Sequence, residues 1–263
     1  MQIIARPSPN FNARKSGAVD MLVLHYTGMQ SCDAALARLC DSAAKVSAHY
    51  LIDEDGQVYR LVAEDQRAWH AGVSCWAGER DVNSRAIGIE LVNPGHEFGY
   101  QTFPQPQMQA LAELSLEILS RHPIPPHFVL GHSDVAPGRK RDPGELFDWA
   151  WLAGQGVGLW SVLSSHLTPP QPLPIKGEGL LPPGSGLLPP PGGEGWGGGP
   201  EIMQLQKDLA RFGYDIPQTG FLGVQTRAVI TAFQRHFRPA KVDGVADAQT
   251  AAILKQLLAQ ITA

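Results

Sequence analysis

Two histidines and one aspartate combine residue types and positions that suit a metal ion. His25 ends the apolar run MLVLH, and His132 follows the apolar run HFVL. Asp142 comes ten residues after His132, in GHSDVAPGRKRDPG, whose glycines and prolines exclude a regular helix or strand. Polar residues at strand ends commonly line a cleft beyond the sheet of an α/β domain. The three residues therefore predict an open metal site, with two imidazole nitrogens, one carboxylate oxygen and a fourth position for water.

The ion that this ligand set favours is zinc. Two histidines and a carboxylate also form the iron site of non-haem oxygenases, which is the alternative. Those iron sites usually lie in all-β barrels, whereas strand-like and helix-like patterns alternate in this part of the sequence. We therefore expect one Zn²⁺ ion.

Two further charged residues could complete a hydrolytic site. Glu90 lies within the apolar run AIGIELVN, and Lys140 comes two residues before Asp142. Zinc lowers the pKa of a bound water toward about 7, and a carboxylate such as Glu90 could take the proton. A cation at Lys140 could face the negative charge that develops on an attacked carbonyl. Together these roles predict hydrolysis of an amide or an ester.

Each of these residues also has an ordinary structural interpretation. A single histidine at a strand end is commonly just a polar residue, and a glutamate in a strand can pair with an arginine. Lys140 lies between Arg139 and Arg141, and a basic run is usually a solvated face. Residue type and spacing alone leave both interpretations open.

Apolar runs predict the strands that must position these side chains. Such runs occur at 21–25, 86–93 and 127–131. Glu54-Asp55-Gly56 predicts a hairpin turn between HYLID and QVYRLV. His25 and Glu90 lie in two of these runs, and His132 directly follows the third.

Helical periodicity occurs between these strands. It predicts a helix over 32–44 and another within PQMQALAELSLEILSRHP, which ends before Pro123. Interleaved strands and helices indicate an α/β domain in which helices flank a mixed central sheet.

A stretch rich in proline and glycine divides the chain. Residues 169–200 include ten prolines and ten glycines, and the unit GLLPP occurs twice. Such a composition forms neither a helix nor a sheet ladder and predicts a disordered linker. We therefore expect a first domain over 1–165, a linker over 166–200 and a second domain over 201–263.

The second domain carries three helical patterns. They lie in EIMQLQKDLARFGY, TRAVITAFQRHF and TAAILKQLL. GFLGVQT (220–226) is echoed by GVADAQT (244–250), each with a glycine for a turn and a threonine, Thr226 or Thr250, that could cap the next helix. The pattern predicts a small all-α three-helix domain.

Five motifs of the first domain resemble one enzyme family. LVLHYT, VSAHYLID, AWHAG, IGIELVN and GHSDVAPGRKRDPG, in that order, are similar to the zinc-dependent N-acetylmuramoyl-L-alanine amidases of the type-2 amidase family. That family is related to phage lysozyme-type amidases and to peptidoglycan recognition proteins. The resemblance covers about 15–150 and implies cleavage of the amide between N-acetylmuramic acid and L-alanine of the stem peptide.

The resemblance also implies roles for single residues. Matched position by position, the zinc ligands would be His25, His132 and Asp142. Glu90 would be the catalytic glutamate and Lys140 the lysine that stabilises the transition state. For substrate contacts, Trp69 and His70 would line the groove and Arg139 would meet a carboxylate of the stem peptide. His49 is expected to pack or hydrogen-bond beneath the site.

The second domain resembles the peptidoglycan-binding module that accompanies many wall hydrolases. That module would raise the concentration of the enzyme on the polymer through the linker. The alternative is a helical domain that only stabilises the protein or mediates contacts. For the whole chain, the alternatives are a peptidoglycan-recognition protein that binds without cutting, and a lysozyme, which would need paired carboxylates and no metal.

Composition bounds the partners and the location. The formal net charge is −4, from 21 basic and 25 acidic residues, which gives no indication of nucleic-acid binding. No apolar run approaches the roughly 18 residues of a membrane span, and three cysteines without metal-like spacing predict no disulfide framework. We expect a monomer that binds peptidoglycan or muropeptide fragments. The module favours the cell envelope, on the periplasmic or outer-membrane side; the cytoplasm is the alternative, because MQIIARPSPNFNARKSG shows no signal pattern.

Overall fold

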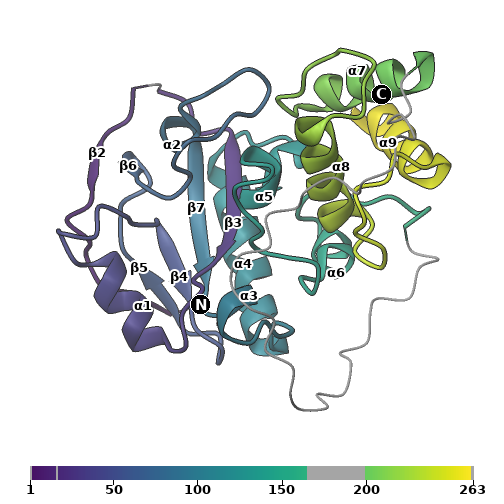
Figure 1. Ribbon diagram of the computed structural model, residues 1–263. Coiled ribbons are helices and arrows are strands. Elements are labelled where there is room, and N and C mark those ends of the chain that lie inside the picture. The colour runs from purple at the N-terminus through teal and green to yellow at the C-terminus, as the bar shows by residue number, and fades with distance from the viewer. Residues whose placement is uncertain (1, 16, 165–198, 262–263) are drawn as a thin grey trace.

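The computed structural model describes residues 2–15, 17–164 and 199–261. Figure 1 shows an α/β part and, beside it, a helical part that forms the C-terminal end of the chain. The predicted linker over 166–200 lies outside the described residues except for its last two, and Pro200 already begins a helix. Within the described ranges, no helix is long and apolar enough to cross a membrane.

The α/β part contains a mixed six-stranded sheet with the order β1-β5-β4-β7-β3-β8. β4, β7, β3 and β8 run parallel to one another, whereas β5 is antiparallel to β4 and parallel to β1. A separate antiparallel pair joins β2 to β6. The strands are β1 (Ile3–Ala5), β2 (Phe11–Ala13), β3 (Met21–Tyr26), β4 (Tyr50–Ile52), β5 (Val58–Arg60), β6 (Gln66–Ala68), β7 (Ala86–Leu91) and β8 (Val129–Gly131).

Helices cover both faces of the sheet. On one face, α4 (Gln105–Arg121) buries Met108, Leu111, Leu114 and Ile118 in a cluster with alternate residues of β3 and β7. On the other face, α1 (Cys32–Leu39) packs against Leu51 of β4. Short helices complete this part: α2 (Val82–Arg85), α3 (Gly95–Phe98), α5 (His132–Val135) and α6 (Trp149–Gly154). The predicted α/β class, with helices flanking a mixed sheet, is confirmed.

Two predicted elements have different ends in the structure. The helix expected over 32–44 ends at Leu39, because the Asp41 carboxylate accepts a hydrogen bond from Ala43 N–H and forms a local turn instead. The strand expected over 127–131 begins only at Val129, since Pro126–Phe128 forms a 3₁₀ turn. The hairpin at Glu54-Asp55-Gly56 is present between β4 and β5.

The three-helix part consists of α7 (Pro200–Phe212), α8 (Val224–Phe237) and α9 (Ala248–Ile261). Thr226 and Thr250 do not cap these helices, because each is the third residue of its helix. Their hydroxyls instead accept hydrogen bonds from the buried amides of Gln206 (2.9 Å) and Gln234 (3.2 Å). The repeated sequence therefore encodes a repeated glutamine-centred turn.

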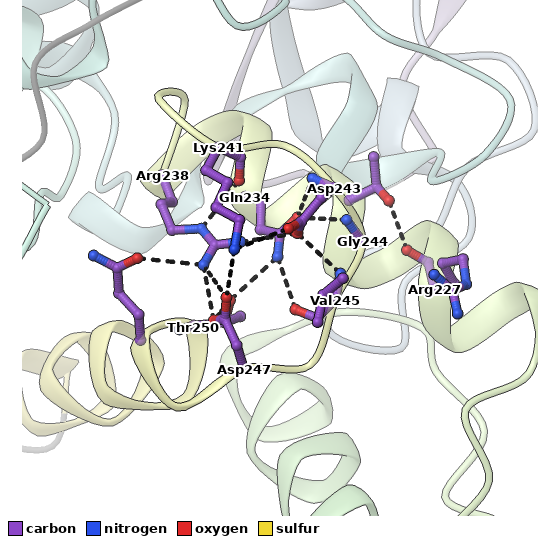
Figure 2. Close-up of polar contacts among 11 residues, drawn as sticks. Arg227, Gln234, Arg238, Lys241, Asp243, Gly244, Val245, Asp247 and Thr250 are labelled. Atoms are coloured by element: carbon purple, nitrogen blue, oxygen red, sulfur yellow. Dashed lines mark hydrogen bonds and ion pairs between the residues drawn. The ribbon is translucent and has the colours of Figure 1, made fainter. Parts of the chain in front are cut away.

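Figure 2 shows the second copy of this turn. The Gln234 amide oxygen accepts from Asp243 N–H and Gly244 N–H, at 3.0 and 2.7 Å. Asp247, which precedes α9, accepts from Thr250 N–H and thus caps the helix. The same carboxylate pairs with Arg238, whose side chain is fully buried. These contacts explain why the second turn carries an aspartate at this position.

The two parts share one hydrophobic cluster. Trp76, fully buried, makes edge contacts with Phe212 and Tyr214, at ring-centroid distances of 6.1 and 4.9 Å. A Cβ on Gly213 would come within 2.5 Å of the Trp76 ring, so the absence of a side chain there permits the close approach. The same cluster holds Met21 and Val23 of β3. The C-terminal helices therefore pack against α5 and the segment that carries Trp76.

Candidate metal centre

Two neighbouring parallel strands place His25 and Glu90 side by side. In the register of β3 and β7, His25 is the partner of Glu90 near the carboxyl ends of both strands. Register partners point to the same face of a sheet. This face is the one opposite α4, because Leu24 and Ile89, which alternate with His25 and Glu90, pack in the α4 cluster.

The stretch after β8 folds back on itself and brings a second histidine and an aspartate to His25. We call residues 131–144 the strap. His132 is the first residue of α5, and Ser133 N–H donates to the backbone oxygen of Asp142 at 2.9 Å. The Asp142–Pro143 peptide is cis. Two ends of the strap thus lie against each other at the carboxyl edge of the sheet.

Three ligand atoms converge at this point. The Nδ1 atoms of His25 and His132 are 2.9 Å apart, and Asp142 Oδ2 lies 3.1 and 2.9 Å from them, respectively. All three side chains are buried. In a tetrahedral zinc site, ligand atoms about 2.0–2.1 Å from the ion lie about 3.3 Å from one another. The group therefore forms a site that could hold a metal ion.

The remaining ring nitrogens are hydrogen-bonded in a way that orients both histidines. His132 Nε2 lies 3.0 Å from the backbone oxygen of Ala71, so Nε2 carries the proton and Nδ1 presents its lone pair. His25 Nε2 lies 3.0 Å from His70 Nδ1. Such partners commonly fix the orientation of metal-ligating histidines.

His70 and His49 form a buried layer beneath His25. Their rings are 5.7 Å apart in an edge arrangement, and His49 Nδ1 accepts from Gly88 N–H at 2.9 Å. Burial, followed by the charge of Arg14, lowers the pKa of His49 to about 3. Burial and the neighbouring His25 likewise hold the pKa of His70 well below its usual value. Both histidines are therefore neutral near pH 7, and His49 lies beneath the site.

Electrostatics favour the ligand forms of His25 and Asp142. Burial, followed by the proximity of His132, lowers the pKa of His25 to about 4, so its ring is neutral. Burial alone would raise the pKa of Asp142, but the charge and hydrogen bond of His132, and then those of His25, hold it below its ordinary value. His25 thus presents a neutral nitrogen and Asp142 an ionised oxygen.

Glu90 is a buried carboxyl group beside this site. Its Oε2 has no hydrogen-bond partner among the described residues. Burial and then the negative charge of Asp142 raise the pKa of Glu90 well above its usual value, while Lys140 opposes the rise. An unpaired carboxyl oxygen in such surroundings is costly unless it has a functional partner.

A cavity of about 720 Å³ opens above Glu90 and the metal-ligand group. Lys140, Arg139 and Arg141 of the strap line one side of it, and residues of α1 line another. The Arg139 guanidinium donates to the backbone oxygens of Ala71 and Val73, both at 2.7 Å. Arg139 therefore ties the strap to residues 71–73 as well as facing the cavity.

Of the residues expected in the substrate groove, Trp69 is not among those that line the cavity. Its indole N–H donates to Asn12 Oδ1 at 2.6 Å, away from His25. The two neighbouring side chains thus have different partners: His70 contacts His25, whereas Trp69 contacts Asn12. His70 lines the cavity but is 6% exposed and contacts His25.

The sequence reasoning assigned no role to another set of cavity residues. The Tyr26 hydroxyl lies 2.9 Å from His96 Nδ1, and His96 Nε2 lies 3.2 Å from Glu145. Tyr26 and His96 both line the cavity. The position of Tyr26 next to His25 was an available signal, whereas nothing in the sequence joins His96 to Glu145.

Two family descriptions match separate parts of the chain. Residues 15–145 match the family described as N-acetylmuramoyl-L-alanine amidase, and residues 198–254 match the one described as a putative peptidoglycan binding domain. Over 256 residues the chain is 36% identical to the N-acetylmuramoyl-L-alanine amidase AmiD of Escherichia coli, covering 91% of this chain and 82% of the relative. It is also 35% identical over 164 residues to the 1,6-anhydro-N-acetylmuramyl-L-alanine amidase AmpD of the same organism, covering 55% of this chain and 86% of AmpD.

Two solved structures are similar over almost the whole chain. One is E. coli AmiD in complex with the substrate anhydro-N-acetylmuramic acid-L-Ala-D-γ-Glu-L-Lys. The comparison has a TM-score of 0.72 and 35% sequence identity, and it covers 95% of this chain and 92% of the AmiD chain. The other is AmpDh3 of Pseudomonas aeruginosa in complex with an anhydromuramic pentapeptide, with a TM-score of 0.73, 32% identity and 95% coverage of both chains.

Proposed function

Because this chain belongs to the N-acetylmuramoyl-L-alanine amidase family, we propose that His25, His132 and Asp142 hold a zinc ion. The reaction is hydrolysis of the amide between N-acetylmuramic acid and L-alanine of the stem peptide. Glu90 and Lys140 complete the proposed catalytic set.

One observation carries the metal assignment. Two imidazole Nδ1 atoms and a carboxylate oxygen lie within 3.1 Å of one another in a buried position. The bond from His132 Nε2 to Ala71 leaves its Nδ1 without a proton. When none of the three atoms carries a proton, they repel one another at this distance unless a cation lies among them. Nitrogen and carboxylate ligands with room for a fourth position suit Zn²⁺.

Zinc bound there would supply Lewis-acid chemistry, by activating water and polarising a carbonyl. The Glu90 carboxylate would accept the proton of the attacking water and later deliver it to the leaving amine of L-alanine. A divalent cation beside Glu90 favours its ionised form, which a general base requires. The Lys140 ammonium would stabilise the negative charge on the attacked carbonyl oxygen.

The proposed substrate is a muropeptide, bound in the cavity above the ligand group. Both similar solved structures hold an anhydromuramic peptide. The basic residues Arg139 and Arg141 line the cavity of this chain, and arginine recognises carboxylates of the kind that stem peptides carry. A contact of Trp69 or His70 with the substrate stays a prediction.

We propose that the protein acts in the cell envelope, as a monomer. The match of 198–254 to a peptidoglycan binding domain supports this location, because the polymer lies there. Cell fractionation tests the location, and recovery in the cytoplasm alone would contradict it. Light scattering of the purified protein tests the monomer.

The reaction is tested by peptide release from a purified anhydromuropeptide. The zinc-loaded protein should release the free stem peptide, chelator should abolish the release, and added Zn²⁺ should restore it. Failure of the zinc-loaded protein to release peptide, with binding retained, would instead indicate a recognition protein. Chelator-resistant formation of reducing sugar ends would indicate a lysozyme.

A further inference from the structure

The strap contains a second buried carboxylate, Asp134, which points away from the ligand group. Its side chain is almost completely buried, with 1% of the residue exposed. Asp134 lies in α5, two residues after His132. The metal-ligand group does not use it, so its partners must explain its burial.

Three donors satisfy the Asp134 carboxylate. Oδ2 accepts from Gly131 N–H at 2.7 Å, within the strap. Oδ1 accepts from the Tyr214 hydroxyl at 2.6 Å, and Oδ2 also contacts His236 Nδ1 at 2.7 Å. Two of the three donors thus come from the C-terminal helices and the loop between them, about 80 and 100 residues further along the chain.

Both distant donors are held rigidly. The His236 ring stacks on Trp149 with a centroid distance of 3.7 Å and is 2% exposed. The Tyr214 ring makes an edge contact with Trp76, and the adjoining Gly213 backbone oxygen accepts from Ala77 N–H at 2.7 Å. Neither side chain can leave Asp134 without disturbing this packing.

The hydrogen bonds at Asp134 bracket a proposed metal ligand. Gly131 directly precedes His132, and Asp134 closes the first turn of the helix that His132 begins. Fixing Gly131 and Asp134 together therefore fixes the backbone from which the His132 ring projects. Hydrogen-bonding groups that hold metal ligands without contacting the ion orient those ligands and tune metal affinity.

A second contact from α8 reaches the opposite wall of the cavity. Arg235, next to His236, donates from Nε to Glu145 Oε2 at 3.4 Å. Glu145 in turn contacts His96, which lines the cavity beside Tyr26. Two successive residues of α8 thus connect the C-terminal part to both sides of the site.

We propose that Tyr214 and His236 are positioning residues of the metal centre, acting on His132 through Asp134. The C-terminal part is then a structural component of the active site as well as a region that matches a polymer-binding domain. This inference rests on the proposed function, because it concerns the metal ion assigned there.

The test compares zinc affinity, by competition with a chromophoric chelator, across full-length variants. Tyr214→Phe removes only a hydroxyl, and His236→Phe keeps the stack on Trp149 but removes the Nδ1 donor. Each should weaken zinc binding about tenfold, the lower end of the effect of outer-shell partners. His236→Asn, whose amide can donate from the position of Nδ1, should restore most of the affinity.

Arg80→Ala is the matched control. Arg80 pairs with Asp215 across the same interface at 3.3 Å, but both side chains are exposed, at 77% and 45%. Its zinc affinity should equal that of the wild type. Absorption spectra of the Co²⁺-substituted proteins report the geometry of the ligands, which a loss of stability alone would not change. These spectra should shift in Tyr214→Phe and His236→Phe only.

The outcomes separate this inference from the proposed function. A wild type that binds no zinc would contradict both. A wild type that binds zinc, with unchanged affinity and Co²⁺ spectra in Tyr214→Phe and His236→Phe, would overturn only this inference. A loss of zinc affinity that is proportional to the loss of thermal stability in every variant, Arg80→Ala included, would also overturn it.

Discussion

His25 owes its orientation to a glycine on the neighbouring strand. Gly88 is two residues before Glu90 on β7, and the His70 ring occupies the space above it. A Cβ at this position would come within 2.5–2.7 Å of three ring atoms of His70. His70 is in turn the hydrogen-bond partner of His25 Nε2. The missing side chain of Gly88 thus makes room for the residue that orients a proposed ligand.

Gly88→Ala should therefore displace His70 and weaken zinc binding about tenfold, with a parallel loss of peptide release. Equilibrium competition with a chelator gives the affinity. Gly154→Ala is the control, because no atom lies within 4 Å of its added Cβ. Equal zinc affinities for the wild type and Gly88→Ala would contradict a role for His70 in orienting His25.

At the scale of single residues, only part of the site could be predicted from the sequence. His25, Glu90, Lys140 and Asp142 could be named because motifs carry them. Gly88 and the partners of Asp134 could not be, since their roles arise from contacts between segments far apart in sequence. Trp69 and His70 share one motif, and such a motif does not reveal which neighbours each side chain contacts.

At the scale of elements, Glu64 joins the hairpin to the end of α4. Its carboxylate accepts from the Tyr50 hydroxyl and Arg121, both at 2.7 Å, and contacts His122 at 2.7 Å. Burial alone would raise the pKa of Glu64, but these partners, Arg121 first, lower it to about 2. The folded state therefore favours the ionised form more than the unfolded chain does, whose glutamate pKa is about 4.3.

Glu64→Gln should lower the free energy of unfolding at pH 7 by about 2 kcal/mol. Since the folded pKa lies below the unfolded one, this contribution is complete above about pH 5 and is lost as the pH falls toward 2. Urea unfolding from pH 7 to pH 3 measures the difference. Glu117→Gln, which removes an exposed partner of Arg121, should cost below about 0.5 kcal/mol. A Glu64→Gln difference that is constant over this pH range would contradict the account.

A second prediction at this scale concerns the glutamine-centred turn. Asp247 both caps α9 and pairs with the fully buried Arg238, as Figure 2 shows. Asp247→Ala should destabilise the protein by about 3 kcal/mol, because it leaves a buried charge with fewer partners. Lys241→Ala removes a 57% exposed partner of the same carboxylate and should cost below about 1 kcal/mol. Thermal unfolding compares the two, and similar losses would be inconsistent with this ranking.

Elements were predicted well where local pattern determines them. Strands β3 and β7 coincide with apolar runs, and helices α4, α7, α8 and α9 follow the periodicity of their apolar residues. Ends were predicted less well, because side chains such as Asp41 stop a helix whose apolar pattern continues. Thr226 and Thr250 have the sequence appearance of caps, but buried glutamines from earlier helices use their hydroxyls.

At the scale of the whole molecule, the two parts form one packed unit over the described residues. The proline- and glycine-rich stretch predicts a tether between independent domains, and the segment that tests this prediction lies outside the described residues. The contacts around Trp76 and Asp134 join the two parts directly. Such docking could not be predicted, since its contacts join residues that lie far apart in the sequence.

Trp76→Ala tests this packing. Removing a fully buried tryptophan from the shared cluster should cost about 4 kcal/mol and, by loosening Tyr214, should also weaken zinc binding. Val73→Ala, in the same loop but 85% exposed, should change neither quantity. Urea unfolding and chelator competition on the same samples give both values. A stability loss without any change in zinc affinity would mean that the interface does not support the metal centre.

The most direct test of the central claim measures zinc content and peptide release together in three proteins. The wild type should hold one zinc ion and release the stem peptide from a muropeptide. Asp142→Ala should lose the zinc and the activity, because it removes one of the three converging ligand atoms. Lys140→Ala should keep the zinc and lose about 10²-fold or more in rate. An Asp142→Ala protein that keeps zinc at full occupancy, or that releases peptide at the wild-type rate, would contradict the account.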